Sequence, residues 1–462
     1  MKKILFITLI VCVFALSACN PSQDTESGET DTITEGETSD IESEMEEADE
    51  GEADEVEEES VWDFNADPVT ISVLSFFSTD DLSVEQSVVD AFAEAYPNIN
   101  VEYDNLAFGD YFDFLVTNIA GGVVPDVMAM NFEQGARFAA MGALEDLTPY
   151  IEAENYNLDK YFTSTVDMHR HEGIQSGLPA TFSIVVNFIN KDLFDEAGIA
   201  YPDETWVWED LIAAAKEMTK DIDGDGIIDQ FGYIAGWWPN FVFQNGAQII
   251  NDEGRCGLNT PEAIEGLQIY VDITLDSEQK IAPDRSELND AGDWDRFQGG
   301  SVAIIPTGPW AITPFKENIG DSFEWDVAPF TSINEPSTLM YGNSYTMSST
   351  SEQKAAAWEF IKFATGERGS TLRQSGGYEI SPIREIATSD FISSLNGVPE
   401  NAHYILDATS YATLPCAHPL WQEMHDIIWP ELEMALQGTK SVEDAMSTAC
   451  QAVDALLEEY GY

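Results

Sequence analysis

The fold is decided by a stretch that opens with Val69-Thr70-Ile71-Ser72-Val73-Leu74 and closes with Asp126-Val127-Met128-Ala129-Met130. Between these two β-branched or apolar runs, apolar residues recur at helical spacing, then alternate, then recur at helical spacing again. In chain order the predicted elements are a strand at 69–74, a helix at 84–95, a strand at 99–103, a helix at 111–119 and a strand at 126–130. This series predicts a parallel, doubly wound α/β sheet.

Residues just beyond the strand ends are the first candidates for a ligand site, because ligands of such sheets bind at the carboxyl ends of the strands. Phe76 follows the first strand, and Asn131 and Glu133 follow the third. Phe76 fits the apolar core as well as it fits a binding site. Asn131 and Glu133 could equally be hydrogen-bonded structural residues.

The remainder of the chain continues to alternate strands and helices. A strand is predicted at 183–188, and helical patterns are found at 211–218, 261–275, 352–363 and from Trp421 to the end. About 400 residues follow the N-terminal segments, which exceeds one ordinary domain and predicts two.

The N-terminus has the pattern of an export signal. Lys2 and Lys3 precede an apolar run, Ile4 to Leu16, that is too short to serve comfortably as a membrane span. The run ends in Leu16-Ser17-Ala18-Cys19, which resembles the lipobox of bacterial lipoproteins. The resemblance implies that Cys19 becomes the acylated N-terminus, and several acyl chains would hold the protein on a membrane. The alternative is a cleavable signal with an incidental cysteine.

An acidic segment follows at residues 20–60, which contain no Lys, Arg or aromatic residue. Such a composition cannot bury enough apolar area to fold, so we expect an extended spacer, although a cation-binding tail has the same composition. The whole chain has a net charge of −66, which excludes nucleic acid as a partner. A saline habitat and a cationic ligand both remain compatible with this charge.

Three cysteines follow the N-terminal segments, namely Cys256, Cys416 and Cys450. Outside the cytoplasm they allow one disulfide and leave one thiol. Their spacings match no disulfide framework and no zinc motif, so the sequence does not choose a pairing.

Four segments together resemble extracellular solute-binding proteins of family 1, the group that includes the maltose-binding protein. They are PDV (125–127) with GALEDLT (142–148); GLP (177–179) with NFINKDLF (187–194) and AGI (197–199); FQGGSVAII (297–305) with GPW (308–310); and AWEFIKF (357–363). Each motif is weak alone, but their order and spacing follow the family over most of residues 69–462.

The resemblance implies an α/β fold of two doubly wound lobes, joined by a multi-segment hinge as in type II periplasmic binding proteins. Ligand contacts on both lobes would favour the closed state. The resemblance implies that the chain passes between the two lobes at three hinge segments, near residues 178–187, 341–345 and 381–384. The implied division is a signal peptide at 1–18, the lipidated cysteine and acidic linker at 19–65, lobe 1 at 66–180 and 341–384, and lobe 2 at 181–340 and 385–462.

Sugar sites pair flat aromatic rings with groups that accept and donate hydrogen bonds. Trp310 follows a Gly-Pro turn that the family uses to aim a tryptophan into the cleft. We expect at least one of Trp237 and Trp238 to face the ligand, and Trp421 stands where maltose binders place another ring, although it could be a core residue at a helix start. Near the hinge, Tyr345 and Arg384 are further polar candidates.

A second motif places Asp221, Asp223, Asp225 and Asp229 at positions one, three, five and nine of a loop, with Ile227 at position seven. This resembles a calcium loop, but Gly232 stands where the bidentate acid would be. A bound calcium would be structural, and an Asp-Gly turn without metal is the alternative. No cofactor is required by the predicted function.

The sequence contains no catalytic motif such as Gly-x-Ser-x-Gly, His-Glu-x-x-His or a phosphate loop, so we predict a non-enzyme. The predicted function is capture of a sugar by a monomeric, lipid-anchored protein on the outer face of the cell membrane and delivery to the permease subunits of an ABC importer. The alternatives are a binding protein for a cationic or other small solute and a secreted glycoside hydrolase with paired carboxylates. His169 and His171 could ligate a metal, but no further ligand cluster accompanies them.

Overall fold

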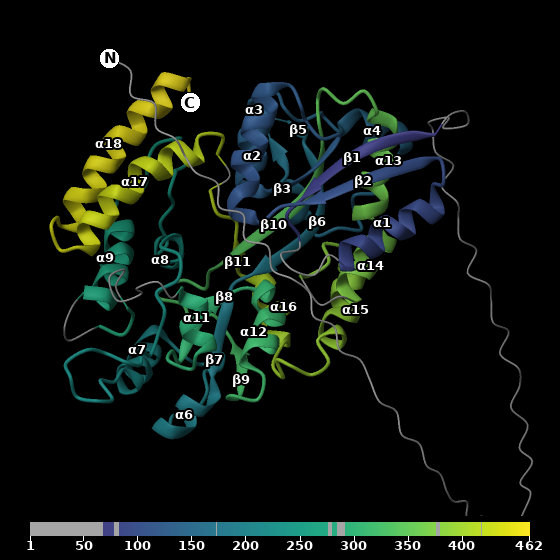
Figure 1. Ribbon diagram of the computed structural model, residues 1–462. Coiled ribbons are helices and arrows are strands. Elements are labelled where there is room, and N and C mark those ends of the chain that lie inside the picture. The colour runs from purple at the N-terminus through teal and green to yellow at the C-terminus, as the bar shows by residue number, and fades with distance from the viewer. Residues whose placement is uncertain are drawn as a thin grey trace, which may run out of the picture. The chain divides into compact units, whose positions relative to one another are not determined.

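The predicted strand–helix series forms one side of a six-stranded sheet (Figure 1). The computed structural model describes residues 68–77, 83–171, 173–275, 280–283, 292–375, 379–416 and 418–462. In it β1 (Val69–Ser75) pairs in parallel with both β2 (Ile99–Asn105) and β3 (Val127–Asn131). The connecting helices are α1 (Ser83–Ala95) and α2 (Phe108–Gly121), so all five predicted elements are confirmed.

The same sheet also has antiparallel strands, which the sequence did not predict. Its order is β11-β10-β3-β1-β2, with β6 (Gly177–Ile184) also paired to β10 (Thr338–Met347). β10 runs antiparallel to β3 and β6, and parallel to β11 (Ala412–Thr413). The sheet is mixed because β10 enters it from a distant part of the chain, with no helical crossover from β3.

A second, three-stranded sheet has β7 (Val186–Asn190) at its centre, antiparallel to β8 (Ile304–Thr307) and β9 (Trp325–Ala328). The single strand predicted at 183–188 is therefore divided between two sheets. The break falls at Val185, whose N–H donates to the Leu339 carbonyl oxygen at 3.0 Å and whose carbonyl accepts from the Thr338 hydroxyl at 2.6 Å.

Helices and short strands surround these sheets (Figure 1). The helix predicted at 261–275 is confirmed with the same bounds, and the C-terminal pattern is divided into two helices. The remaining elements are α3 (Phe132–Ala140), α4 (Thr148–Glu154), α5 (Thr163–Asp167), β4 (Arg170–His171), β5 (Ile174–Gln175), α6 (Lys191–Ala197), α7 (Trp208–Met218), α8 (Pro239–Gln244), α9 (Pro261–Leu275), α11 (Asp293–Gln298), η1 (Pro309–Ala311), α12 (Ile312–Ile319), α13 (Lys354–Thr365), α14 (Glu367–Ser375), α15 (Arg384–Ser394), α16 (His403–Asp407), η2 (Ala408–Ser410), α17 (Trp421–Leu436) and α18 (Val442–Tyr460).

Three apolar clusters account for most of the interior. The first core packs α1, α2, α13 and the six-stranded sheet, and the second core packs α7, α8, α9, α17 and α18. The third core packs the three-stranded sheet with α12, α15 and α16. Along β10, Met340 belongs to the third core and Tyr345 to the first, so this strand contributes side chains to both cores. The hinge crossings implied by the resemblance stay a prediction.

A buried ion pair ties α1 to α14 inside the first core. Glu85 and Arg373 are both nearly inaccessible, and Arg373 Nη2 donates to Glu85 Oε2 at 2.9 Å. Burial opposes the charged form of Arg373, but the charge and the hydrogen bonds of Glu85 raise the pKa of Arg373 above its ordinary value, and such pairing is the condition under which a buried charge is tolerated.

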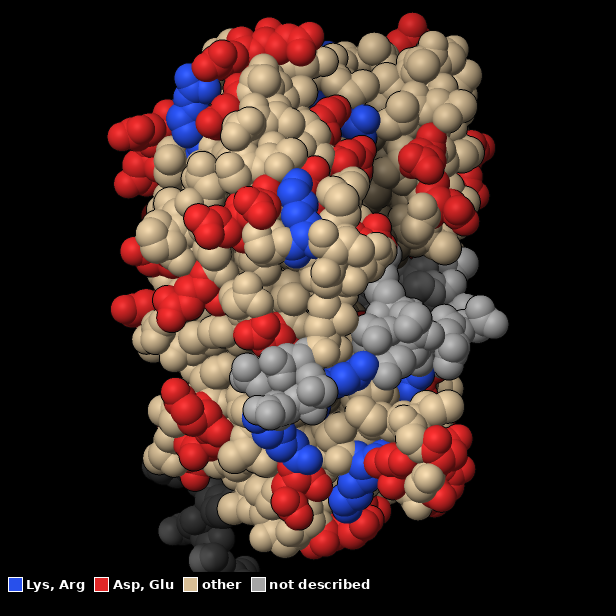
Figure 2. Space-filling view, turned by 90° about the vertical axis from the view of Figure 1, so that its left-hand side faces the viewer, with Lys and Arg blue, Asp and Glu red and all other residues tan. Residues whose placement is uncertain are grey.

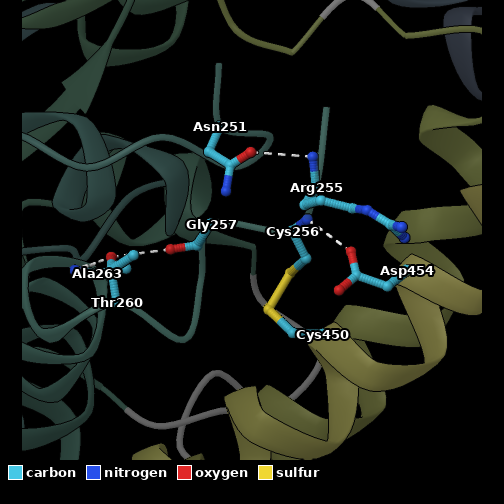
Figure 3. Close-up of a disulfide and its surroundings, with 8 residues drawn as sticks. All are labelled: Asn251, Arg255, Cys256, Gly257, Thr260, Ala263, Cys450 and Asp454. Carbon is cyan, nitrogen blue, oxygen red and sulfur yellow. Dashed lines mark hydrogen bonds between the residues drawn. A yellow bond between two sulfur atoms is a disulfide. The ribbon is translucent and has the colours of Figure 1, made fainter. Parts of the chain in front are cut away.

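A disulfide ties the turn before α9 to α18 (Figure 3). Cys256 and Cys450 are separated by 194 residues, and the backbone N–H of Cys256 also donates to Asp454 Oδ1 at 2.9 Å. Cys416 is the remaining thiol among the described residues. The structure thus selects one of the pairings that the sequence left open.

The predicted signal peptide, the lipidation site Cys19 and the whole acidic linker lie outside the described residues. Within the described residues, no helix has both the length and the apolar character that a membrane span requires. All described residues belong to one compact unit, Glu59–Tyr462.

Candidate functional site

Four aromatic rings from separate segments meet around Tyr341 on β10. The Tyr341 ring centroid lies 5.5 Å from that of Trp310, 5.8 Å from that of Phe132 and 6.0 Å from that of Trp237. Tyr341, Trp310 and Trp237 are partly buried residues that pack against one apolar cluster. We call these four residues the ring group.

The position of Trp310 follows from the local sequence. β8 ends at Thr307, and the Gly308-Pro309 pair starts the short helix η1, which carries Trp310. The indole folds back over Gly308, where an added Cβ would lie 2.3 Å from the ring. Only glycine leaves room for this ring position, so the motif fixes the ring next to Tyr341.

A second glycine positions Trp237. Gly236 has a φ of +66°, and a Cβ there would lie 2.8 Å from the Pro306 side chain on β8. The turn therefore packs closely on β8 and presents Trp237 to Tyr341 with the two ring planes 36° apart.

The neighbouring tryptophans are oriented differently. Trp238 is fully buried in the second core. Trp421, at the start of α17, is 5% exposed and packs edge-on against Trp237, with the centroids 6.0 Å apart. Of the predicted tryptophans, Trp237 and Trp310 are thus in the ring group, Trp421 supports Trp237 from behind, and Trp238 is a core residue.

A carboxyl group completes the site from the other side. Asn131 caps α3 by accepting from the Gln134 N–H at 2.9 Å, and its Nδ2 donates to Glu133 Oε2 at 3.4 Å. Burial raises the pKa of Glu133 to about 7, with the Asn131 hydrogen bond opposing the shift. Burial and then the charge of Glu133 also raise the pKa of Tyr341, which places the carboxyl group near the ring group.

Three further candidates are not brought to the ring group. Phe76 packs against Tyr111 in the first core, with centroids 4.9 Å apart. Tyr345 is fully buried and donates to Glu85 Oε2 at 3.1 Å. Arg384 donates to the Asp159 carbonyl oxygen at 2.9 Å. Each of these side chains has a structural partner.

Two of the residues around the site were not selected from the sequence. Tyr341 was noted only as part of a hinge crossing, and Phe132 was not noted at all. The signal that could have found Phe132 is its position between Asn131 and Glu133 at the end of a parallel strand. Tyr341 had no local signal, because its ring neighbours on α3, on η1 and just before α8 are distant in sequence.

The acidic loop lies elsewhere, on the surface. Asp221 accepts from the N–H groups of Gly224 and Gly226, both at 2.8 Å, and Asp229 accepts from the Ile222 N–H at 2.7 Å. Asp221, Asp223 and Asp225 each offer a carboxylate oxygen, and these oxygens lie within 4.8 Å of one another. The donor set suits a hard cation, and the carbonyl of Ile227 was the further expected ligand; calcium binding here stays a prediction.

Two α/β sheets with separate cores, several chain passages between them and a ring group at β10 define a two-lobed α/β solute-binding protein, with the fold of the type II periplasmic binding proteins. The family model described as bacterial extracellular solute-binding protein matches residues 78–370. The chain belongs to this family.

Several known proteins are similar to this chain over most of its length. The mannitol-binding protein of Pseudomonas aeruginosa is 23% identical and covers 86% of this chain and 94% of its own. The galactooligosaccharide-binding protein of Bacillus subtilis is 22% identical and covers 73% and 76%. An ABC substrate-binding protein from Listeria monocytogenes, solved in complex with cycloalternan, is 28% identical, has a TM-score of 0.78 and covers 85% of this chain and 100% of its own.

Proposed function

We propose that this protein is the substrate-binding component of an ABC importer and that it binds a carbohydrate at the ring group. The observation that carries the proposal is the meeting of the Trp237, Trp310 and Tyr341 rings, together with a carboxyl group, that of Glu133, whose charge raises the pKa of Tyr341. Sugar rings present apolar CH faces that stack on aromatic rings, and hydroxyl edges that bond to carboxyl and amide groups. The arrangement offers both kinds of contact.

The location of the site supports capture by closure. Tyr341 lies on β10, which contributes side chains to the third and first cores. Trp310 lies on η1, just after β8 of the second sheet, and Glu133 on α3, just after β3 of the first. A ligand that contacts groups from both sheets favours the closed state by its differential affinity, and no catalytic group is needed. The sugar-binding names of several relatives agree with this proposal.

We extend the proposal to the cellular location. The lipobox-like Leu16-Ser17-Ala18-Cys19 and the acidic segment 20–60 support a protein tethered by acyl chains on the outer face of the membrane, beside its permease subunits. In metabolic labelling with a palmitate analogue, we expect the wild-type protein to incorporate the label and the Cys19→Ser variant to remain unlabelled. Labelling of the Cys19→Ser protein would contradict the anchor.

A cationic solute is the second candidate, favoured by charge. Figure 2 shows Asp and Glu side chains over much of the displayed face, with fewer Lys and Arg, and aromatic rings beside a carboxylate also bind cations. The pKa of about 7 for Glu133 works against this candidate, because the group is then only partly ionised at neutral pH.

Calorimetric titration of the soluble protein with neutral saccharides and with polyamines separates the two candidates. We expect a saccharide to bind reversibly and unaltered, and Trp310→Ala to weaken it by about 2 kcal/mol, roughly 30-fold. Trp206→Ala, a partly exposed tryptophan outside the ring group, is the control. Binding of polyamines but of no saccharide would reject the carbohydrate proposal. Recovery of a chemically altered saccharide would contradict the prediction that the protein is not an enzyme.

A further inference from the structure

A buried glutamine at the end of α8 holds the loop that connects β9 to β10, residues 329–337, which we call the β9–β10 loop. Gln244 is 2% exposed, and its Nε2 donates to the carbonyl oxygens of Thr331 at 3.2 Å and of Ser337 at 3.1 Å. A primary amide has two N–H donors, so a single side chain can satisfy both carbonyls. These two acceptors lie towards opposite ends of the loop, and the side chain therefore ties the ends together.

The backbone strengthens the same contact. The Gln244 carbonyl oxygen accepts from the N–H groups of Asn334 at 3.1 Å and Glu335 at 3.0 Å, and the side-chain amide of Asn334 donates to Asn245 Oδ1. The last turn of a helix leaves its carbonyl groups without partners inside the helix. The loop therefore satisfies the C-terminal end of α8, and α8 in turn satisfies the loop.

Both sides of this contact carry rings of the ring group. Trp237 lies two residues before α8, and its carbonyl oxygen accepts from the Asn240 N–H at 3.1 Å. Tyr341 is the fourth residue of β10, which follows the β9–β10 loop. Phe330, in the loop, belongs to the apolar cluster against which Trp237 and Tyr341 pack. Gln244 therefore connects the segment that carries Trp237 to the strand that carries Tyr341.

Ring packing alone does not define the relative position of these two rings. Aromatic pairs accept arrangements from offset stacking to edge-to-face contact. The observed arrangement of Trp237 and Tyr341, with centroids 6.0 Å apart and ring planes at 36°, therefore needs a further restraint. Hydrogen bonds supply one, because their distances and angles are narrowly defined. Binding sites depend on such supporting bonds to hold their contact groups within about 0.5 Å.

We propose that Gln244 is a positioning residue of the ligand site: by holding the β9–β10 loop on α8, it fixes the relative position of the Trp237 and Tyr341 rings. This inference rests on the proposed function, because it assumes that a ligand stacks on these rings. It assigns an effect on ligand affinity to a buried glutamine outside the ring group.

The first test is calorimetric titration of Gln244→Leu with the saccharide that binds the wild type. Leucine keeps a similar size but removes both donors, so the loop loses its side-chain tie, and we expect affinity to fall about tenfold. The matched control is Gln230→Leu, because Gln230 is 6% exposed and its Nε2 donates to the Met218 carbonyl oxygen at 2.6 Å. The control should also lower stability, but it should leave the affinity unchanged.

The second test needs no ligand and reports the surroundings of the ring itself. In fluorine NMR of the protein labelled with fluorotryptophan, the Trp237 signal is assigned by its loss in Trp237→Phe. We expect Gln244→Leu to shift or broaden this signal and Gln230→Leu to leave it in place. A general loss of stability would not move one tryptophan signal selectively.

The outcomes separate this inference from the proposed function. Either wild-type affinity or an unmoved Trp237 signal in a folded Gln244→Leu protein overturns the inference, and so does an equal loss of affinity in Gln230→Leu. If Gln244→Leu does not fold, Asn334→Ala takes its place, because it removes the bond to Asn245 from an exposed residue, and an unmoved Trp237 signal then overturns the inference. If the wild type binds no saccharide, the proposed function fails, whereas the fluorine signal still decides whether Gln244 positions Trp237.

Discussion

The first and second cores each join segments that are far apart in the sequence, but they do so by different chemistry. In the first core, Glu85 and Arg373 are separated by 288 residues and form a buried ion pair. In the second core, Cys256 and Cys450 are joined covalently. A buried ion pair depends on both partners being present, whereas a disulfide depends on an oxidising environment. The two regions should therefore respond to different perturbations.

Removal of the disulfide should have the largest effect. For a loop of 194 residues, chain entropy alone gives a stabilisation of about 5 kcal/mol. We expect the double variant Cys256→Ala/Cys450→Ala, measured by urea unfolding, to lose up to this amount. Wild type treated with reductant should approach it, and Cys416→Ala, which changes the remaining described thiol, should not. Equal stability of the wild type and the double variant would show that the disulfide does not stabilise the folded protein.

Breaking the ion pair should come second and should be independent of redox conditions. Arg373→Met leaves the Glu85 carboxylate buried without its partner, at a cost of about 3–5 kcal/mol. The double variant Glu85→Gln/Arg373→Met should recover part of this loss. Arg255→Met removes an exposed pair with Glu458, beside the disulfide, and should have a much smaller effect on stability, because water screens an exposed pair. If Arg255→Met and Arg373→Met reduced stability equally, burial of the Glu85–Arg373 pair could not be the cause of its larger expected effect.

A buried histidine between α5 and β4 should make the stability of the fold sensitive to acid. Burial lowers the pKa of His169 to about 3, below its ordinary value near 6.5. Between these values the unfolded chain binds a proton that the folded chain does not, so stability falls as the pH is lowered from 6.5 towards 3. Between pH 7 and pH 5 the His169 contribution is about 2 kcal/mol.

The matched measurement is the free energy of unfolding against pH for the wild type and for His169→Gln. We expect the wild type to lose about 2 kcal/mol more than the variant between pH 7 and pH 5. Parallel curves would show that His169 is not protected from protonation in the folded protein.

Calcium should give the smallest effect. If the loop containing Asp223 binds the ion, a concentration ten times the dissociation constant raises stability by about 1.4 kcal/mol. We expect thermal unfolding of the wild type to shift upward with calcium, and that of Asp223→Ala to shift less. Magnesium at equal ionic strength controls for screening of the acidic surface. An equal shift for the two proteins would leave the loop as a turn without metal.

The parts of the fold that were predictable have local causes. The apolar runs of β1 and β3, the alternation in β2 and the helical spacing in α1, α2 and α9 follow from which faces each element buries, and the structure confirms these elements. The division of the 183–188 run was not predictable, because its cause is the pairing of Val185 with Leu339, more than 150 residues away.

The site was predictable only in part, for the same reason. Trp310 was selected because its Gly308-Pro309 turn resembles a turn of the family, and the structure places its ring in the ring group. Trp237 and Trp238 could not be distinguished, because adjacent residues in a turn point to opposite sides and only the packing of α17 decides which is buried. The pairing of Cys256 with Cys450 likewise needs the fold.

The contact of the Trp310 ring with Gly308 has a consequence for binding thermodynamics. A tryptophan on an open loop has two side-chain torsions to restrict when a ligand stacks on it, and such ordering costs about 0.5–1.5 kcal/mol per side chain. Because the ring already rests on the glycine backbone, that entropy is lost on folding and not on binding. Even the small Gly308→Ala change would displace the ring, so the affinity of this protein for its ligand depends on the absence of one methyl group.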